Sequence, residues 1–494
     1  MSQKRGTRLG LVCGIAVALA ALGSCVDEKI VYRDGPVFVT PPTAAAGFLG
    51  YSDELAKKTV CGNCHVTQQG KWVATAHAGA FQTLESSGHM QGTCQNCHTV
   101  NDRGNTVTDT TAGWRSTHDE RYHDVQCESC HGPGLQHVTA PARGQMLPTI
   151  RLDTAAISTN SCGECHSGTH HPFAEEWAET RHASSARRAY GGGSLNPSCR
   201  GCHVGQSVLE SWGVNTNYIE RTQGQTLATA EGVTCVVCHD PHGSGNPKQL
   251  RYPVDSRDPS TNLCVRCHDK RSNPDFTGNR DSPHAPHGPL IFGTAGWWPP
   301  NVEFEETESS HSSDRNPKLC AGCHVQNYQV TDKATGAFQV QVVGHRFLAI
   351  PCVDANGAPT ESQTCQISAR SYRSCAASGC HTEATARSAL ANAEADIGFL
   401  TGTLDNMLTQ VPASEKLPAA AGKITTARGA AYNSALAKTH GAEVHNPFLV
   451  KALLRASIVQ VSSDYGLPLP PGLNLAPYDS IIGTRARVTG TASR

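Results

Sequence analysis

The segment Cys61-Gly-Asn-Cys-His65 is the first of nine places where a pair of cysteines is followed directly by a histidine. Eight of them have the spacing C-x-x-C-H: Cys61/Cys64/His65, Cys94/Cys97/His98, Cys127/Cys130/His131, Cys162/Cys165/His166, Cys199/Cys202/His203, Cys235/Cys238/His239, Cys264/Cys267/His268 and Cys320/Cys323/His324. The ninth, Cys375/Cys380/His381, has four residues between its cysteines. This spacing is typical of heme c attachment, in which both thiols form thioethers and the histidine binds the iron. We therefore predict nine covalent hemes.

Other uses of such a motif must be weighed. A single C-x-x-C-H is also compatible with half of a zinc site or with a thioredoxin-like redox pair. Here the histidine follows the second cysteine every time and no C-x-x-C lacks it, which a zinc array does not require. Heme is therefore favoured. In the ninth motif the linker Ala-Ala-Ser-Gly must bulge to bring both sulfurs to one porphyrin edge, and its small residues permit that.

Four cysteines remain outside the motifs, namely Cys13, Cys25, Cys352 and Cys365. The last two lie in a loop that contains glycine and proline. In an oxidising compartment a disulfide between them is favoured over two free thiols.

The N-terminus predicts export. Lys4, Arg5 and Arg8 precede an apolar stretch from Leu9 to Leu22, which is too short to span a bilayer. We interpret residues 1–24 as a lipoprotein signal peptide, with lipid on Cys25 and a Pro-containing tether at 25–54. An ordinary cleaved signal peptide or a short anchor is the alternative. The expected location is the outer membrane, facing the periplasm or the cell exterior.

Composition fits a fold filled by prosthetic groups. Only 38% of residues are hydrophobic and 6% aromatic, which is poor for a conventional core in 494 residues. We expect a mainly α multiheme cytochrome c fold with long loops and little β, wrapped around closely packed hemes. The formal charge of -1 becomes more negative on loss of the signal peptide, and each oxidised heme adds about -1. Such a charge disfavours nucleic acid as a partner.

An internal repeat organises the chain. The pattern W-x-x-T-x-H-A occurs at Trp72–Ala78 and at Trp177–Ala183, each time after a heme motif. It predicts two three-heme modules at 55–150 and 151–260, and a looser third set at 261–381. A C-terminal helical region at 382–460 and an irregular tail at 461–494 follow.

Fifteen histidines lie outside the motifs, and only three methionines follow the signal peptide. Two histidines per iron is thus the economical assignment, and it implies low potentials. The candidates for the second ligand are His77, His137, His182, His242, His287, His311, His345 and His445. We expect helices at His77 and His182. We also expect Asn446 and Pro447 to open a helix from Phe448 to Val459.

At the level of whole motifs the chain resembles multiheme c-type cytochromes. Cys61–His77 and Cys162–His182 are similar to the family of the tetraheme cytochrome that accepts electrons from hydroxylamine oxidoreductase. The amphipathic stretch from His381 to Val411 and Val444-His-Asn-Pro447 are similar to the helical end of pentaheme and octaheme reductases. The resemblance implies electron transfer or, in some members, chemistry on small nitrogen and sulfur compounds.

Two functions follow from these observations. The favoured one is an electron carrier rather than an enzyme. Its partners would be other cytochromes, a porin or a quinol-linked donor, metal oxides, or like subunits in a filament. The alternative is a multiheme oxidoreductase of small nitrogen or sulfur compounds, with one heme open to substrate. The surplus of histidines favours the carrier.

Overall fold

The computed structural model describes residues 45–141, 162–191, 194–214, 226–275, 282–300, 302, 307–362, 364–377, 379–416, 424–471 and 473. The predicted signal peptide, Cys25, much of the tether and the last part of the tail lie outside these residues. Within the described residues no helix is both long and apolar enough to cross a membrane.

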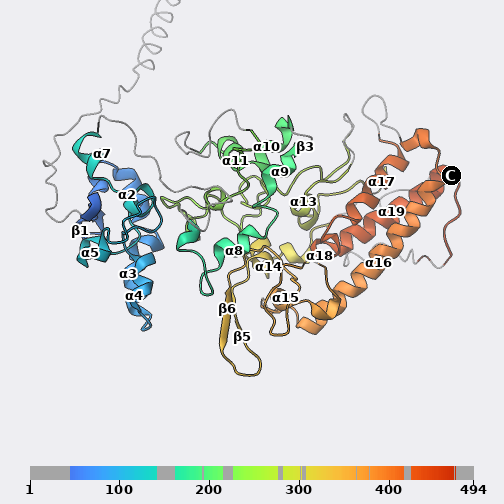
Figure 1. Cartoon of the computed structure of the whole chain (residues 1–494). Coiled ribbons are helices and arrows are strands. Elements are labelled where there is room, and N and C mark those ends of the chain that lie inside the picture. Colours follow the sequence, from blue (N-terminus) through green and yellow to red (C-terminus); the bar gives the residue numbers. More distant parts are fainter. Residues whose placement is uncertain are drawn as a thin grey trace, which may run out of the picture. The chain divides into compact units, whose positions relative to one another are not determined.

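Short helices joined by irregular segments and a few short strands make up the described residues as far as His381 (Figure 1). The α-helices are α2 Val66–Trp72, α3 Ala80–Ser86, α4 Gly92–His98, α5 Trp114–Thr117, α6 Cys127–His131, α7 Leu135–Thr139, α8 Phe173–Ala178, α9 Ser185–Ala189, α10 Pro197–His203, α11 Gly205–Ser211, α12 Cys235–Cys238, α13 His287–Ile291, α14 Cys320–His324 and α15 Arg373–Ala377. The 3-10 turns are η1 Ala45–Gly47, η2 Cys61–Asn63, η3 Ala76–Gly79, η4 Glu120–Tyr122, η6 Cys162–Glu164, η8 Pro247–Gln249, η9 Ser310–Ser312, η10 Ile367–Ala369 and η11 Ala413–Lys416.

Strands are few in the described residues. They form three two-stranded antiparallel sheets: β1 Tyr51–Asp53 with β2 Lys58–Thr59, β3 Tyr190–Gly191 with β4 Ser194–Leu195, and β5 Tyr328–Thr331 with β6 Phe338–Val342. In the longest sheet Tyr328 lies opposite Val342. The prediction of a mainly helical fold with little β is confirmed.

Longer helices follow His381 (Figure 1). They are α16 Glu383–Thr409, α17 Thr426–Ala437 and α19 Pro447–Tyr465, with the short helix α18 Ala442–His445 just before α19. Thr382, Thr425 and Asn446 cap α16, α17 and α19, because each side-chain oxygen accepts a backbone N–H of the first turn. The predicted amphipathic helix is confirmed. The helix opened by Asn446 is also confirmed and runs beyond Val459.

The largest apolar core lies among these C-terminal helices. Its buried members include Leu400, Leu404, Leu436, Leu453 and Ile458. Complete burial of one such side chain stabilises the fold by about 1.5–3 kcal/mol. The segment before residue 300 joins this core through Trp297. Asn433 accepts the Trp297 backbone N–H at 2.8 Å and donates to its carbonyl at 2.7 Å.

Apolar clusters elsewhere are smaller, and buried polar groups hold the loops. One of them, in the N-terminal part of the described chain, contains Phe48, Phe81, Val100, Ala112, Trp114 and Tyr122. Glu128, inside the third motif, is buried and accepts N–H groups of Leu49, Gly50 and Gly134 at 2.7–3.0 Å. One carboxylate thus gathers two loops around its motif.

The two copies of W-x-x-T-x-H-A make the same contacts. The indole N–H of Trp72 donates to the Val125 carbonyl at 3.0 Å, and that of Trp177 donates to the Val233 carbonyl at 2.8 Å. The Val125 N–H in turn donates to the His77 carbonyl, and the Val233 N–H to the His182 carbonyl. Each Val lies two residues before the third motif of its repeat. The tryptophan and histidine of each copy are therefore tied to that motif.

The backbone at these two histidines differs from the expectation of helices. His77 lies in the 3-10 turn η3, whereas His182 lies in a turn between α8 and α9. The hydrogen bonds to the following valines hold both residues in place without an α-helix.

The predicted disulfide is present. Cys352 and Cys365 are bonded and close a loop of thirteen residues ahead of the ninth motif. The backbone also closes this loop, since the Val353 N–H donates to Ala369.

Candidate heme sites

Each regular motif is a single helical turn. The histidine N–H donates to the carbonyl of the first cysteine, for example His65 to Cys61 at 2.9 Å and His166 to Cys162 at 2.8 Å. Residues three apart share one face of such a turn, so both thiols of a motif point the same way. None of the eighteen motif cysteines forms a disulfide in the described chain. The described residues also contain no cluster of three or more His, Cys, Asp or Glu side chains suited to a metal ion.

The ninth motif departs from this turn as its longer linker requires. Helix α15 ends at Ala377, and Gly379 has a φ of 73°. This left-handed conformation is accessible to glycine at little cost. The Gly379 N–H donates to Ala376, so the linker folds back on the helix that carries Cys375. Cys375 is half-buried, whereas Cys380, beyond the linker, is exposed.

Eight motif histidines each face a histidine from elsewhere in the chain. The pairs, with ring-centroid separations, are His65–His137 6.3 Å, His166–His77 6.1 Å, His131–His242 6.2 Å, His268–His182 6.1 Å, His203–His284 5.9 Å, His239–His345 6.3 Å, His381–His311 6.4 Å and His324–His445 6.1 Å. Two imidazoles on opposite sides of one metal ion, each with a bond of about 2 Å, have centroids roughly 6 Å apart. The separations therefore fit one iron per pair.

Several of these histidines are oriented by backbone carbonyls. Nδ1 lies 2.7 Å from Phe347 O in His324, 2.8 Å from Lys248 O in His239 and 2.8 Å from Val444 O in His311. A carbonyl can only accept, so Nδ1 carries the proton and Nε2 keeps its lone pair. This is the tautomer that a metal-binding histidine needs.

Burial keeps paired histidines neutral. Burial, followed by neighbouring histidines, lowers the pKa of His166 to about 4 and that of His268 to about 3. The pKa of His445 is also lowered well below its usual value, mainly by burial. Neutral imidazole is the form that binds metal.

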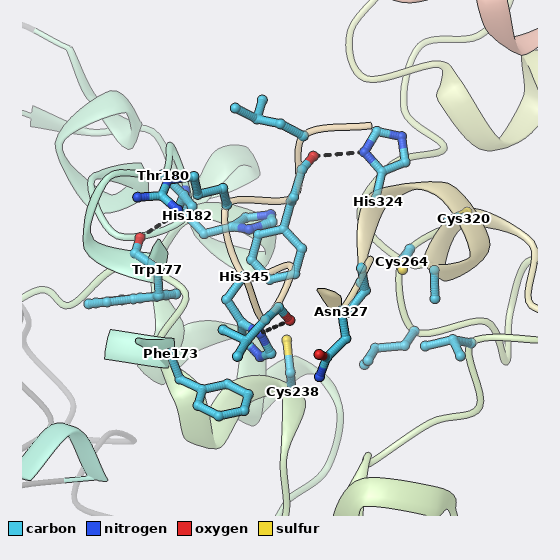
Figure 2. Close-up of a pocket in the computed structure, with 18 of the residues that line it drawn as sticks. Phe173, Trp177, Thr180, His182, Cys238, Cys264, Cys320, His324, Asn327 and His345 are labelled. Atoms are coloured by element: carbon cyan, nitrogen blue, oxygen red, sulfur yellow. Dashed lines mark hydrogen bonds between the residues drawn. The ribbon is translucent and has the colours of Figure 1, made fainter. Parts of the chain in front are cut away.

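Seven of the eight pairs line one large cavity of about 4330 Å³, which extends from Ala74 to Lys451 in the sequence. A pocket for one drug-sized ligand measures about 300–1,000 Å³, so this space suits several large groups. Figure 2 shows part of it. Labelled side chains from distant parts of the sequence lie around a common space there, namely the motif residues Cys238, Cys264, Cys320 and His324 and the opposed histidines His182 and His345. The residues present fit heme c in type, spacing and shape.

The first motif is the exception to this shared space. Cys64 is exposed, in contrast to the half-buried cysteines of the other regular motifs, and neither Cys64 nor His65 lines the cavity. The Cys64 thiol therefore lies at the surface of the described residues. The physical reason is local, because Cys64 ends the short turn η2, in which only Gly62 is buried. His65 still faces His137, so Cys64 stays a predicted attachment residue with its thiol at the surface.

Comparisons with known proteins agree with these sites. A family model described as a doubled CXXCH motif matches residues 228–273, and the model for cytochrome c554 and c-prime matches residues 60–132. The chain is a multiheme c-type cytochrome. Its cofactor is heme c.

Curated relatives match this cytochrome in part. It is 25% identical over 268 residues to the C-type polyheme cytochrome OmcB of Geobacter sulfurreducens, covering 48% of the chain and 32% of the relative. It is 22% identical over 223 residues to the multiheme cytochrome MtrA of Shewanella baltica, covering 43% and 59%. The cytochrome thus spans about a third of OmcB and under two thirds of MtrA.

Two solved structures are also similar to this chain. The outer cell wall cytochrome OcwA has a TM-score of 0.48 at 19% identity, with 74% of this chain and 75% of that one covered. An undecaheme cytochrome from the S-layer of Carboxydothermus ferrireducens has a TM-score of 0.48 at 18% identity, with 88% and 71% covered.

Thiols of different motifs contact each other in this cytochrome. Pairs of these thiols lie within electrostatic range of each other: Cys61 and Cys127, Cys97 and Cys165, Cys162 and Cys235, Cys202 and Cys267, and Cys264 and Cys320. Further cysteines are electrostatic neighbours: Cys130 of Cys162, Cys238 of Cys264, and Cys323 of Cys375. The motifs beginning at Cys61, Cys127, Cys162, Cys235, Cys264, Cys320 and Cys375 thus form a continuous series. Those at Cys94 and Cys199 contact it from the side.

The structure pairs seven of the eight predicted second ligands with a motif histidine. The eighth, His287, lies beside His268 and His445, each of which already faces another histidine. Its Nδ1 is 3.4 Å from His268 Nδ1 and its Nε2 is 3.3 Å from the His440 carbonyl oxygen. His284 faces His203 instead, and sequence reasoning did not select it. Both residues occur in Pro283-His-Ala-Pro-His287, where nothing in the pattern separates them. His98 has no histidine ring opposite it at this spacing among the described residues.

Proposed function

We propose that this cytochrome carries nine covalent hemes and transfers electrons through them, with each iron held between two histidines. The eight opposed pairs at 5.9–6.4 Å carry the proposal. The eighteen cysteines and nine motif histidines predicted from the sequence attach the hemes, and His284 takes the place given to His287 in the ligand set.

Heme iron bound by two histidines supplies a one-electron couple at low potential. The chain's own residues set that character. The opposed histidines would hold each iron from both sides and would leave no position for a substrate. Carbonyl acceptors such as Phe347 O and Lys248 O hold Nδ1–H, so Nε2 stays directed at the partner ring. Together these features support a carrier over an enzyme.

The thiol contacts support conduction along the chain. They place consecutive members of the series side by side from Cys61 to Cys375. A thioether sulfur lies at the edge of its porphyrin, so motifs in sulfur contact present neighbouring edges to one another.

Export as an outer-membrane lipoprotein is part of the proposal. The basic residues, apolar stretch and Cys25 of the N-terminus support it. The acidic holoprotein favours basic redox partners or metal cations. Such partners are other cytochromes, a porin-embedded or quinol-linked donor, metal oxides or like subunits.

The alternative is an oxidoreductase of small nitrogen or sulfur compounds. It requires one iron with an open position, and the absence of an opposed ring at the described His98 is the observation that favours it.

Heme counting combined with carbon monoxide binding tests the proposal. Pyridine hemochrome quantitation against protein mass should give nine hemes. Carbon monoxide, which binds reduced heme only at an open position, should give no stoichiometric difference spectrum. Binding of about one carbon monoxide per chain, together with turnover of nitrite, hydroxylamine or tetrathionate, would favour the enzyme.

A further inference from the structure

The opposed pairs follow a rule that links consecutive repeats. The first-motif histidine of a repeat faces the histidine that comes after the first motif of the preceding repeat: His166 faces His77, His268 faces His182 and His381 faces His311. Under this rule the motif at Cys375 acts as a first motif.

The third motifs follow a companion rule. With the motif at Cys320 taken as the third motif of its repeat, the partner comes after the third motif of the next repeat: His131 faces His242 and His239 faces His345. No third motif follows Cys375, and His324 faces His445, which comes after that last motif. Ligands are therefore exchanged between repeats in a regular way.

Second motifs occur at His98 and His203. His203 faces His284, which comes sixteen residues after His268, the first-motif histidine of the next repeat. The partner of His98 should likewise come after His166, the first-motif histidine of the next repeat. The residue sixteen positions after His166 is His182, which already faces His268. The histidines that remain there, ahead of α8, are His170 and His171.

Contacts of the motifs themselves support this equivalence. Cys97 of the second motif is an electrostatic neighbour of Cys165 of the next repeat, as Cys202 is of Cys267. The Gly104 N–H, just after the His98 motif, donates to the Glu164 carboxylate at 2.8 Å. The second motif of the first repeat is thus docked against the segment that leads into His170 and His171.

The two candidates differ in their surroundings. His170 stacks on Phe338 of β6, with ring centroids 4.7 Å apart and planes 6° from parallel. His171 is an electrostatic neighbour of His98, and both line the large cavity. Its backbone is fixed, because its N–H donates to Gly168 at 3.0 Å and its carbonyl accepts from Phe173 at 2.7 Å. His98 Nδ1 lies 2.7 Å from Ala80 O, which leaves Nε2 for metal.

We propose that His171 is the second histidine ligand of the heme attached at Cys94, Cys97 and His98. The inference rests on the proposed heme-filled carrier and completes its ligand set. It also removes the open position that the oxidoreductase alternative needs.

The test is low-temperature EPR of oxidised holoprotein variants, with heme content measured in parallel. His171→Ala should convert about one ninth of the ferric heme from low spin to high spin. His170→Ala is the matched control and should change nothing. His284→Ala should match His171→Ala in size, and the double variant should give about two ninths. His171→Met should keep the heme low-spin and raise one potential.

Some results would overturn the assignment. Full heme content with no high-spin signal in His171→Ala contradicts it, as does a high-spin signal in His170→Ala. If His171→Ala loses one heme, peptide mass mapping decides: loss at Cys94/Cys97 supports the assignment and loss elsewhere contradicts it. In each of these cases the hemes of the wild-type protein are still low-spin. Only the His171 assignment then fails, and the proposed carrier function stands. If the wild-type protein already contains a high-spin heme, and His171→Ala leaves that signal unchanged, the result contradicts both the His171 assignment and the carrier function.

Discussion

His77 faces His166 with ring centroids 6.1 Å apart, although the two residues belong to consecutive repeats. One iron between them would join the repeats through its two axial bonds. His77→Ala should therefore leave the heme at His166 with one histidine and produce a high-spin ferric signal. His118→Asn is a suitable control, since His118 is exposed, has a φ of 50° that asparagine tolerates, and opposes no motif histidine. Unchanged EPR in His77→Ala would contradict the pairing.

Replacing one axial histidine by methionine should test the series of thiol contacts. Methionine raises the potential of one heme, which then holds electrons. In His77→Met that heme belongs to the motif at Cys162, within the series, so conductance through a protein film should fall. In His284→Met the heme with the raised potential belongs to the motif at Cys199, which lies outside the series, so conductance should stay near the wild-type value. Equal losses in the two variants would show that the series does not carry the current.

The repeated tryptophan bonds predict equal stability losses. Trp177→Phe removes the N–H that donates to Val233 O, and Trp72→Phe removes the equivalent bond to Val125 O. Loss of one such bond costs about 1 kcal/mol. Chemical unfolding followed by the heme absorbance should show similar shifts for both. A shift in one variant alone would mean that the copies are not equivalent.

The ninth site can be removed by itself. Cys375→Ala with Cys380→Ala should lower the heme count by one and leave the other hemes attached, as measured by pyridine hemochrome and intact mass. An unchanged mass difference between holoprotein and apoprotein would show that this motif carries no heme.

Breaking the disulfide should weaken the loop ahead of that site. Cys352→Ser with Cys365→Ser opens a thirteen-residue loop and is expected to cost about 3 kcal/mol by loop entropy. The heme count should stay the same, because neither cysteine belongs to a motif. Loss of a heme instead of stability would give the disulfide a role in attachment.

The sequence predicted what depends on local chemistry. The helix cap at Asn446, the amphipathic helix after His381 and the Cys352–Cys365 disulfide follow from residues close together in the chain. The repeated W-x-x-T-x-H-A pattern also singled out His77 and His182 as ligands. These features need only short-range geometry.

What the sequence could not provide depends on contacts between distant segments. His284 and His287 are three residues apart, and only the position of His203 separates their roles. The turn at His182 is set by its bond with Val233, fifty-one residues away. The exposure of Cys64 depends in the same way on which segments cover it, and the motif spacing carries no such information. The exchange of ligands between repeats likewise becomes visible only when the pairs are measured.

The central claim is that the irons lie between two histidines. Low-temperature EPR of the fully oxidised wild-type holoprotein, with spins integrated against the heme count, tests it most directly. We predict low-spin ferric signals that sum to all nine hemes. A substantial high-spin ferric signal in protein with its full heme content would contradict the claim.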